Sequence, residues 1–183
     1  MALLQSIMIP LGTAMPRFTL QDPLGKKYKD TELYGPQGLL VGFFCNHCPY
    51  ALAVWQRFIR VAEYARTVRI GTAAINPNIH PDYPEDAPDK MLVKIKEWDL
   101  QFPYLVDDTQ TVARDFKAQC TPDIFLFNHE RKLIYHGRID DNWQDEAKVT
   151  REELKEAITN YVTGQPLSTT QMPCMGCSIK WRK

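Results

Sequence analysis

A pair of cysteines separated by two residues stands between an apolar run typical of a strand and a segment with the spacing of a helix. Residues 38–44 form a nearly continuous apolar run, which is typical of a strand buried on both faces. Cys45 follows this run, and Cys48 precedes residues 51–65, where apolar residues recur at spacings of three and four. That spacing indicates an amphipathic helix packed against a sheet. The order strand, Cys-x-x-Cys, helix restricts the chain to folds that place both sulfurs at the start of a helix beside a sheet.

Strands and helices alternate along the rest of the chain. The pattern predicts further elements, in chain order, at 68–75, 87–98, 104–106 and 109–118. A hairpin is predicted around the turn at 22–25, and a second one joins strands at 123–127 and 132–137. These elements predict an α/β protein with a central mixed β-sheet flanked by helices and with an N-terminal β-hairpin.

The last helix and the tail behind it complete the predicted organisation. Thr150 and Glu153 fit a capping box at the start of this helix, and Gly164 ends it. Residues 165–183, which we call the tail, are mostly polar and carry a second Cys-x-x-Cys, formed by Cys174 and Cys177. We therefore predict one domain over residues 1–164 followed by the tail.

Charge and cysteine content narrow the classes of function. The 22 basic and 22 acidic residues balance, so neither a nucleic acid nor a membrane is an expected partner. The N-terminal residues have no basic start and no unbroken apolar stretch, and we expect a cytoplasmic protein. The five cysteines form two close pairs and one singleton, which favours redox chemistry or metal binding over a framework of structural disulfides. No cofactor is expected.

The first cysteine pair has the residue types that thiol–disulfide exchange needs. Free amide groups and the dipole of a helix start favour a thiolate, and we expect them to lower the pKa of Cys45 to about 4–7. A protonated His47 would favour that thiolate further. Cys45 is therefore the predicted nucleophile, and Cys48, one turn further in and less exposed, is suited to resolving a mixed disulfide.

Other interpretations of the cysteines remain open at this stage. A Cys-x-x-Cys can bind structural zinc, and two cysteines can simply be small core residues. The two pairs together could also form a four-thiolate zinc or copper site, in which case the protein is a metal-binding or copper-handling module rather than an enzyme.

The order of elements resembles that of the thioredoxin superfamily, and it assigns the domain at 1–164 a thioredoxin-like fold. The step from Thr121 to Pro122, just before a strand, is similar to the superfamily's cis-proline. The resemblance implies that this proline lies beside the cysteine pair, and that Thr121 and Pro122 bind substrate as an added strand. Pro122 therefore joins Cys45, His47 and Cys48 as a predicted site residue.

A closer resemblance is to the peroxiredoxin-like branch of the alkyl hydroperoxide reductase/thiol-specific antioxidant (redoxin) family. The matching motifs extend from Pro-x-Phe-x-Leu-x-Asp at 16–22 to Gly-Cys-Ser-Ile-Lys-Trp at 176–181, and include Phe-Cys-Asn-His-Cys-Pro-Tyr at 44–50 and Cys-Thr-Pro-Asp at 120–123. Family tails carry serine where this chain has Cys174.

The resemblance implies two possible reactions for this site. Cys48 aligns with the peroxidatic cysteine of true peroxiredoxins, but Cys45 stands where those enzymes have threonine or serine. The first expectation is a thiol–disulfide oxidoreductase that uses Cys45 and Cys48, and the alternative is a thiol-dependent peroxidase that uses Cys48. Its partners would be a protein or small-molecule disulfide or thiol and an electron donor such as a thioredoxin or glutathione system.

The remaining cysteines are candidates for accessory redox roles. Cys120 precedes the predicted cis-proline step, so it either lies near Cys45 or serves as a small buried apolar residue. Ile179 and Trp181 are large apolar residues that should return the tail to the domain. Cys174 and Cys177 could then relay electrons to the first pair, Cys177 could bond to Cys120, or the tail cysteines could be inert.

Overall fold

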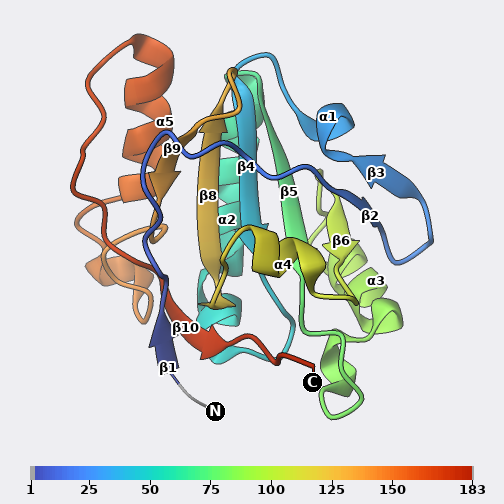
Figure 1. Cartoon of the computed structure of the whole chain (residues 1–183). Helices are drawn as coiled ribbons and strands as arrows, with labels where there is room; N and C mark the ends of the chain where they lie inside the picture. Colours follow the sequence, from blue (N-terminus) through green and yellow to red (C-terminus); the bar gives the residue numbers. More distant parts are fainter. Residues whose placement is uncertain (1–2, 183) are drawn as a thin grey trace.

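The computed structural model describes residues 3–182, and in it a central mixed sheet has helices on both faces (Figure 1). One part of this sheet has the strand order β3 (Lys27–Lys29), β2 (Thr19–Gln21), β6 (Tyr104–Val106), β5 (Ile70–Asn76). The other part has the order β4 (Gly38–Phe43), β8 (Asp123–Asn128), β9 (Leu133–His136). The Phe44 amide donates to the Ile75 carbonyl, which joins the two parts where β4 lies beside β5. Only β5 and β6 pair in parallel among the strand pairs within these two parts.

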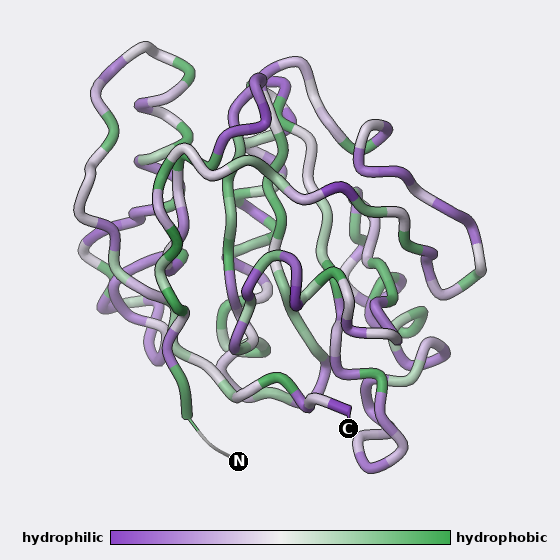
Figure 2. Tube along the Cα trace, viewed as in Figure 1, coloured by the Kyte–Doolittle hydropathy of each residue, from purple (hydrophilic) through white to green (hydrophobic). Residues whose placement is uncertain are grey.

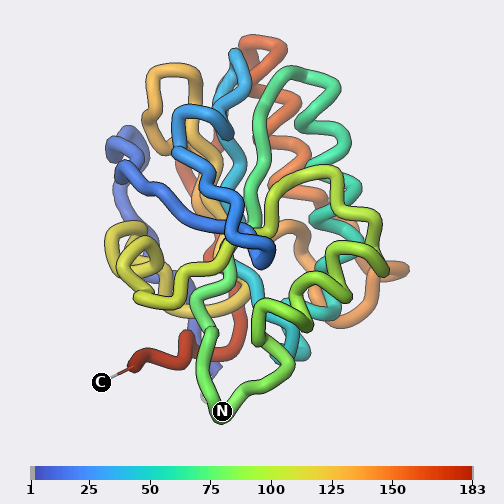
Figure 3. Tube along the Cα trace, turned by 90° about the vertical axis from the view of Figure 1, so that its right-hand side faces the viewer, coloured from blue at the N-terminus to red at the C-terminus, as the bar shows by residue number. Residues whose placement is uncertain are grey.

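A separate, smaller sheet joins three distant parts of the chain. Its order is β1 (Leu3–Gln5), β10 (Met175–Ser178), β7 (Cys120–Thr121), and both pairings are antiparallel. Beyond β10 the tail runs past the loop that follows β5, and the Lys180 amide donates to the Asn78 side chain (Figures 1 and 3). The tail is therefore part of the same folded body as the central sheet.

Helices cover the central sheet from two sides. The long α2 (Pro49–Thr67) lies behind β4 and β8 in Figure 1, and α4 (Thr111–Asp115) lies in front of them. The remaining helices, including two short 3-10 turns, are α1 (Asp30–Leu33), η1 (Pro84–Asp86), α3 (Pro88–Glu97), η2 (Glu146–Lys148) and α5 (Glu153–Thr163). None of the helices in residues 3–182 has both the length and the apolar character needed to cross a bilayer.

The core explains why β4 is apolar at nearly every position. Alternate side chains of this strand enter two different clusters, one against α2 and one against α4. Leu40 belongs to the first, together with Trp55 and Phe58 of α2. Phe43 belongs to the second and packs edge-on against Phe116. The strands at the centre are correspondingly hydrophobic in Figure 2.

Most of the predicted architecture is confirmed, including the mixed sheet and both hairpins. Three helices differ in their boundaries, and one of them, α4, spans only Thr111–Asp115 of the predicted 109–118. Cys45 was expected at the start of α2. The helix instead begins at Pro49, and its N-cap is Cys48, three residues after Cys45. Helix α5 begins at Glu153, and the predicted capping box is wrong, because the Thr150 hydroxyl donates to the carboxylate of Asp141 instead.

Candidate active site

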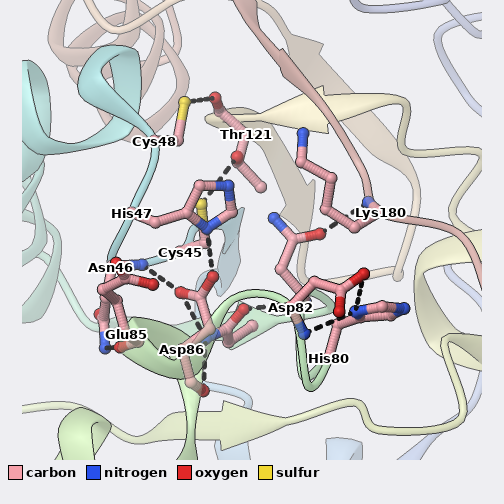
Figure 4. A network of polar contacts seen from close by, with 12 residues as sticks. Cys45, Asn46, His47, Cys48, His80, Asp82, Glu85, Asp86, Thr121 and Lys180 are labelled. Atoms are coloured by element: carbon pink, nitrogen blue, oxygen red, sulfur yellow. Dashed lines mark hydrogen bonds and ion pairs between the residues drawn. The ribbon is translucent and has the colours of Figure 1, made fainter. Parts of the chain in front are cut away.

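Three segments that are far apart in the sequence meet at the end of β4 (Figure 4). Cys45 follows β4, and Cys48 is the N-cap of α2. Thr121 ends β7, and Asp86 ends the short helix η1. The fold thereby gathers the predicted residues around the cysteine pair and adds Asp86, which the sequence analysis did not foresee.

Thr121 contacts both cysteines. Its Oγ1 lies 3.1 Å from the Cys45 Sγ, and its carbonyl oxygen accepts from the Cys48 Sγ at 3.0 Å (Figure 4). The peptide bond between Thr121 and Pro122 is cis, as the resemblance implied. Both cysteines and Thr121 are fully buried, so the expected difference in exposure between Cys45 and Cys48 is absent.

The pKa values of the two cysteines are the reverse of the expected order. Hydrogen bonds from the thiols of Cys45 and Cys177 and from the Ala51 amide outweigh burial and lower the pKa of Cys48 to about 5. Burial, its bond to Cys48 and the negative charge of Asp86 raise the pKa of Cys45 well above its usual value. The prediction of a low-pKa Cys45 is wrong because Cys45 is fully buried and lies outside α2, which begins at Pro49 with Cys48 as its N-cap.

His47 points toward Asp86. Its Nδ1 is paired with the Asp86 carboxylate, and its ring stacks on Tyr83 with 4.6 Å between the centroids. Its Nε2 is buried and has no hydrogen-bond partner among the described residues. The Asp86 carboxylate therefore lies next to the His47 ring and is also one of the groups that raise the pKa of the Cys45 thiol.

Asp86 organises the loop that carries His47. Its Oδ1 accepts from the Asn46 amide at 2.5 Å and from the Asn76 side chain at 3.3 Å. The Asn46 side chain in turn donates to the Glu85 carbonyl at 2.9 Å. In the sequence, Asp86 is one of several acidic residues in a polar loop, and only the fold reveals that its side chain is fully buried.

The four-thiolate metal site is not assembled. Within residues 3–182, only Cys45, His47 and Asp86 form a group of three or more potential ligands whose atoms all lie within 4.8 Å of one another. Cys174 is directed elsewhere, because its Sγ donates to the Gly137 carbonyl at 2.9 Å. Hydrogen bonds already link Asp86 to His47 and to the Asn46 amide.

The tail returns to the domain, as predicted, and strand β10 brings it to the site. Ile179 is buried in the core, and Trp181 lies under the Arg114 guanidinium at 4.4 Å from its carbon to the ring centroid. Cys177 faces Thr121 across the β7–β10 pair, and burial and the neighbouring Cys48 thiol raise the pKa of the Cys177 thiol to about 12.

The thiols of the other two accessory candidates donate to backbone carbonyls. Cys120 donates to the Pro122 carbonyl at 3.3 Å, and Cys174 donates to Gly137. Burial raises the pKa of both thiols. All five cysteines are free in this structure.

Comparison with known proteins identifies the fold and the family. The model of the AhpC/TSA family matches residues 11–136. An uncharacterized conserved protein from Geobacillus kaustophilus is 35% identical, with a TM-score of 0.94 over 100% of this chain and 97% of its own. None of the curated proteins compared with the chain matches it.

More distant structures share the fold. The peroxidoxin BcpB from Mycobacterium tuberculosis is 15% identical, with a TM-score of 0.63 over 87% of this chain and 100% of its own. The thioredoxin domain of a thiol-disulfide oxidoreductase from Bacteroides vulgatus is 14% identical, with a TM-score of 0.63 over 85% of this chain and 99% of its own. The predicted thioredoxin-like fold is confirmed, and the chain belongs to the AhpC/TSA, or redoxin, family.

Proposed function

We propose that this protein is a cytoplasmic thiol–disulfide oxidoreductase in which Cys48 is the nucleophile and Cys45 the resolving thiol. The observation that carries the proposal is the position of Cys48 at the N-cap of α2, where hydrogen bonds lower its pKa to about 5. At neutral pH such a thiol is almost entirely thiolate, which is the reactive form. This assignment exchanges the roles that the sequence analysis gave to the two cysteines.

In the proposed reaction, the Cys48 thiolate attacks one sulfur of a substrate disulfide and releases the other as a thiolate. The Cys45 sulfur then attacks Cys48, which closes the Cys45–Cys48 disulfide and releases the second substrate thiolate. Cys45 loses a proton in this step, and the His47–Asp86 pair, whose ligand atoms lie within 4.8 Å of the Cys45 sulfur, can accept it. Two electrons pass from the dithiol to the substrate.

Thr121 and Pro122 are the proposed binding edge for a protein or small-molecule substrate. A thioredoxin or glutathione system would return the disulfide to the dithiol. The test is the reduction potential, measured by equilibrating the protein with glutathione buffers and determining the thiols by mass. We expect a Cys45–Cys48 disulfide with a potential above about −270 mV, the value for thioredoxin, because a stabilised thiolate favours the reduced form. If no such disulfide forms, the proposal is wrong.

The pH dependence of alkylation provides a further prediction. Because only the thiolate reacts, the iodoacetamide labelling rate of Cys48 should be nearly constant from pH 8 to pH 6 and should halve near pH 5. A thiol with a usual pKa of about 8.5 would instead react roughly tenfold more slowly for each pH unit below that value. Cys45→Ala removes the strongest of the hydrogen bonds to Cys48 and should move the profile to higher pH. An unchanged profile in that variant would contradict the assigned cause.

The lowered pKa of Cys48 also favours a second candidate, a thiol-dependent peroxidase. The thiolate would attack hydrogen peroxide, forming a Cys48 sulfenic acid and releasing hydroxide, which takes up a proton from the solvent to become water. A neighbouring thiol would condense with that acid to give a disulfide and a second water. Peroxide-dependent consumption of a thiol donor, lost in Cys48→Ser, would support this activity. Consumption equal to that of the variant would exclude it.

A further inference from the structure

The edge of β7, which is the proposed binding edge for substrate, is already occupied by the chain itself. Strand β10 pairs with β7 in an antiparallel arrangement that aligns Cys177 with Thr121 and Ser178 with Cys120. On its other side β10 pairs with β1, where Leu4 faces Gly176. The tail therefore lies where an added substrate strand would lie, and β1 secures it from outside (Figure 1).

This placement depends on a close approach between the two backbones. A Cβ atom built on Gly176 would lie 2.1 Å from the Thr121 carbonyl oxygen and 2.6 Å from its carbon. Only glycine fits at this position without displacing one of the strands. The contact is thus made by the same Thr121 carbonyl that accepts from the Cys48 thiol.

Of the tail cysteines, which both lie in the described residues, Cys177 is the one aligned with Thr121, the residue that contacts the proposed nucleophile. The carbonyl oxygen of Thr121 accepts from the Cys48 thiol at 3.0 Å, and the thiols of Cys48 and Cys177 shift each other's pKa. Cys174 donates to the Gly137 carbonyl and does not take part. Cys48 therefore has one neighbouring thiol on β10 and another just after the end of β4.

We infer that residues 175–178 act as an internal substrate strand, and that Cys177 exchanges disulfides with Cys48. This inference rests on the proposed function of the Cys45–Cys48 pair and extends it to a third thiol. In the exchange, Cys177 loses its proton and its sulfur attacks Cys48 of the Cys45–Cys48 disulfide. A Cys48–Cys177 bond forms, the Cys45–Cys48 bond breaks, and Cys45 leaves as a thiolate that takes up the proton. No net oxidation occurs.

The Thr121 hydroxyl assists the departure of Cys45 in this step. Its Oγ1 lies 3.1 Å from the Cys45 sulfur and can donate to the thiolate as it leaves. The exchange leaves the tail covalently attached at the binding edge. An external substrate must then displace β10 before it can pair with β7, so the redox state of Cys177 controls access to the site.

Disulfide mapping of the full-length Cys45→Ser variant tests the inference. After oxidation with oxidised glutathione and an acid quench, we expect a Cys48–Cys177 disulfide. Cys45→Ser/Cys177→Ser should instead keep glutathione on Cys48 at least about tenfold longer, because no thiol resolves the mixed disulfide. Cys45→Ser/Cys174→Ser is the matched control and should behave as Cys45→Ser does. If glutathione stays equally long in all three variants, or if Cys48 bonds to Cys174, the inference is wrong.

A second measurement does not require a change at either reactive sulfur. In the reduced chain, Gly176→Ala should increase the alkylation rate of Cys48 by about tenfold or more, because the displaced strand no longer covers the thiolate. An unchanged rate would show that β10 does not control access.

The failure of the inference can be distinguished from the failure of the proposed function. If the unmodified chain forms Cys45–Cys48 and exchanges with glutathione while Cys45→Ser never forms Cys48–Cys177, only the role of the tail is wrong. If the unmodified chain neither forms Cys45–Cys48 nor exchanges, the proposed function itself is wrong.

Discussion

Replacing Cys48 with serine is expected to lower the rate of disulfide exchange by roughly three orders of magnitude, because a serine hydroxyl is not ionised at neutral pH and is a poor nucleophile toward sulfur. The Cys45→Ser variant should still form the mixed disulfide on Cys48, but Cys45 can no longer resolve it. With Ellman's reagent in a single turnover, Cys45→Ser should release a first thionitrobenzoate promptly and a second only as Cys177 resolves the mixed disulfide, and Cys48→Ser should release none on that timescale.

The two substitutions are matched controls for each other. Both replace a fully buried sulfur with a hydroxyl beside Thr121, so a general loss of structure would affect both. If Cys48→Ser forms the trapped mixed disulfide and Cys45→Ser is inactive, Cys45 is the nucleophile. The order assigned from the sequence would then be right despite the raised pKa of the Cys45 thiol.

Asp86→Ala is expected to destabilise the folded protein by about 3–5 kcal/mol, since it removes the partner of several buried groups at once. The Asn46 amide, the Asn76 side chain and the His47 ring would all lose the Asp86 carboxylate. Urea denaturation followed by circular dichroism measures this difference in the free energy of unfolding.

A carboxylate in the same loop serves as the control. Asp82 has a side chain that is 81% exposed and lies 3.7 Å from His80, so Asp82→Ala should change stability by no more than about 0.5 kcal/mol. Equal stability of the two variants would mean that Asp86 does not hold the loop in place. Asp86→Asn has a second readout, since removing its negative charge should lower the pKa of the Cys45 thiol.

The parts of the site that could be predicted are those encoded by neighbouring residues. The apolar run before Cys45 and the helical spacing after Cys48 were sufficient to predict the strand, the pair and the helix in order. The first residue of that helix was not predictable from spacing alone. It places Cys48 rather than Cys45 at the N-cap, and the burial of Cys45 together with its hydrogen bond to Cys48 reverses the expected pKa order.

The contacts that sequence patterns could not supply come from distant segments. Asp86 is 39 positions from His47 in the chain and becomes its partner only through the fold. Cys177 reaches Cys48 because β10 joins β7, a pairing that local periodicity does not encode. A contact between separate segments also explains why the predicted capping box is wrong. The Thr150 hydroxyl donates to the Asp141 carboxylate in a neighbouring loop and does not cap the start of α5.

The complete burial of Cys48 beneath β10 has a kinetic consequence. A covered thiolate reacts with an outside molecule only during the moments when its cover is open. At low reagent concentration the observed rate is the intrinsic rate multiplied by the open fraction, so chemically different reagents keep their usual order of reactivity. At high concentration every opening leads to reaction, the rate reaches a plateau equal to the opening rate, and the plateau is the same for all reagents.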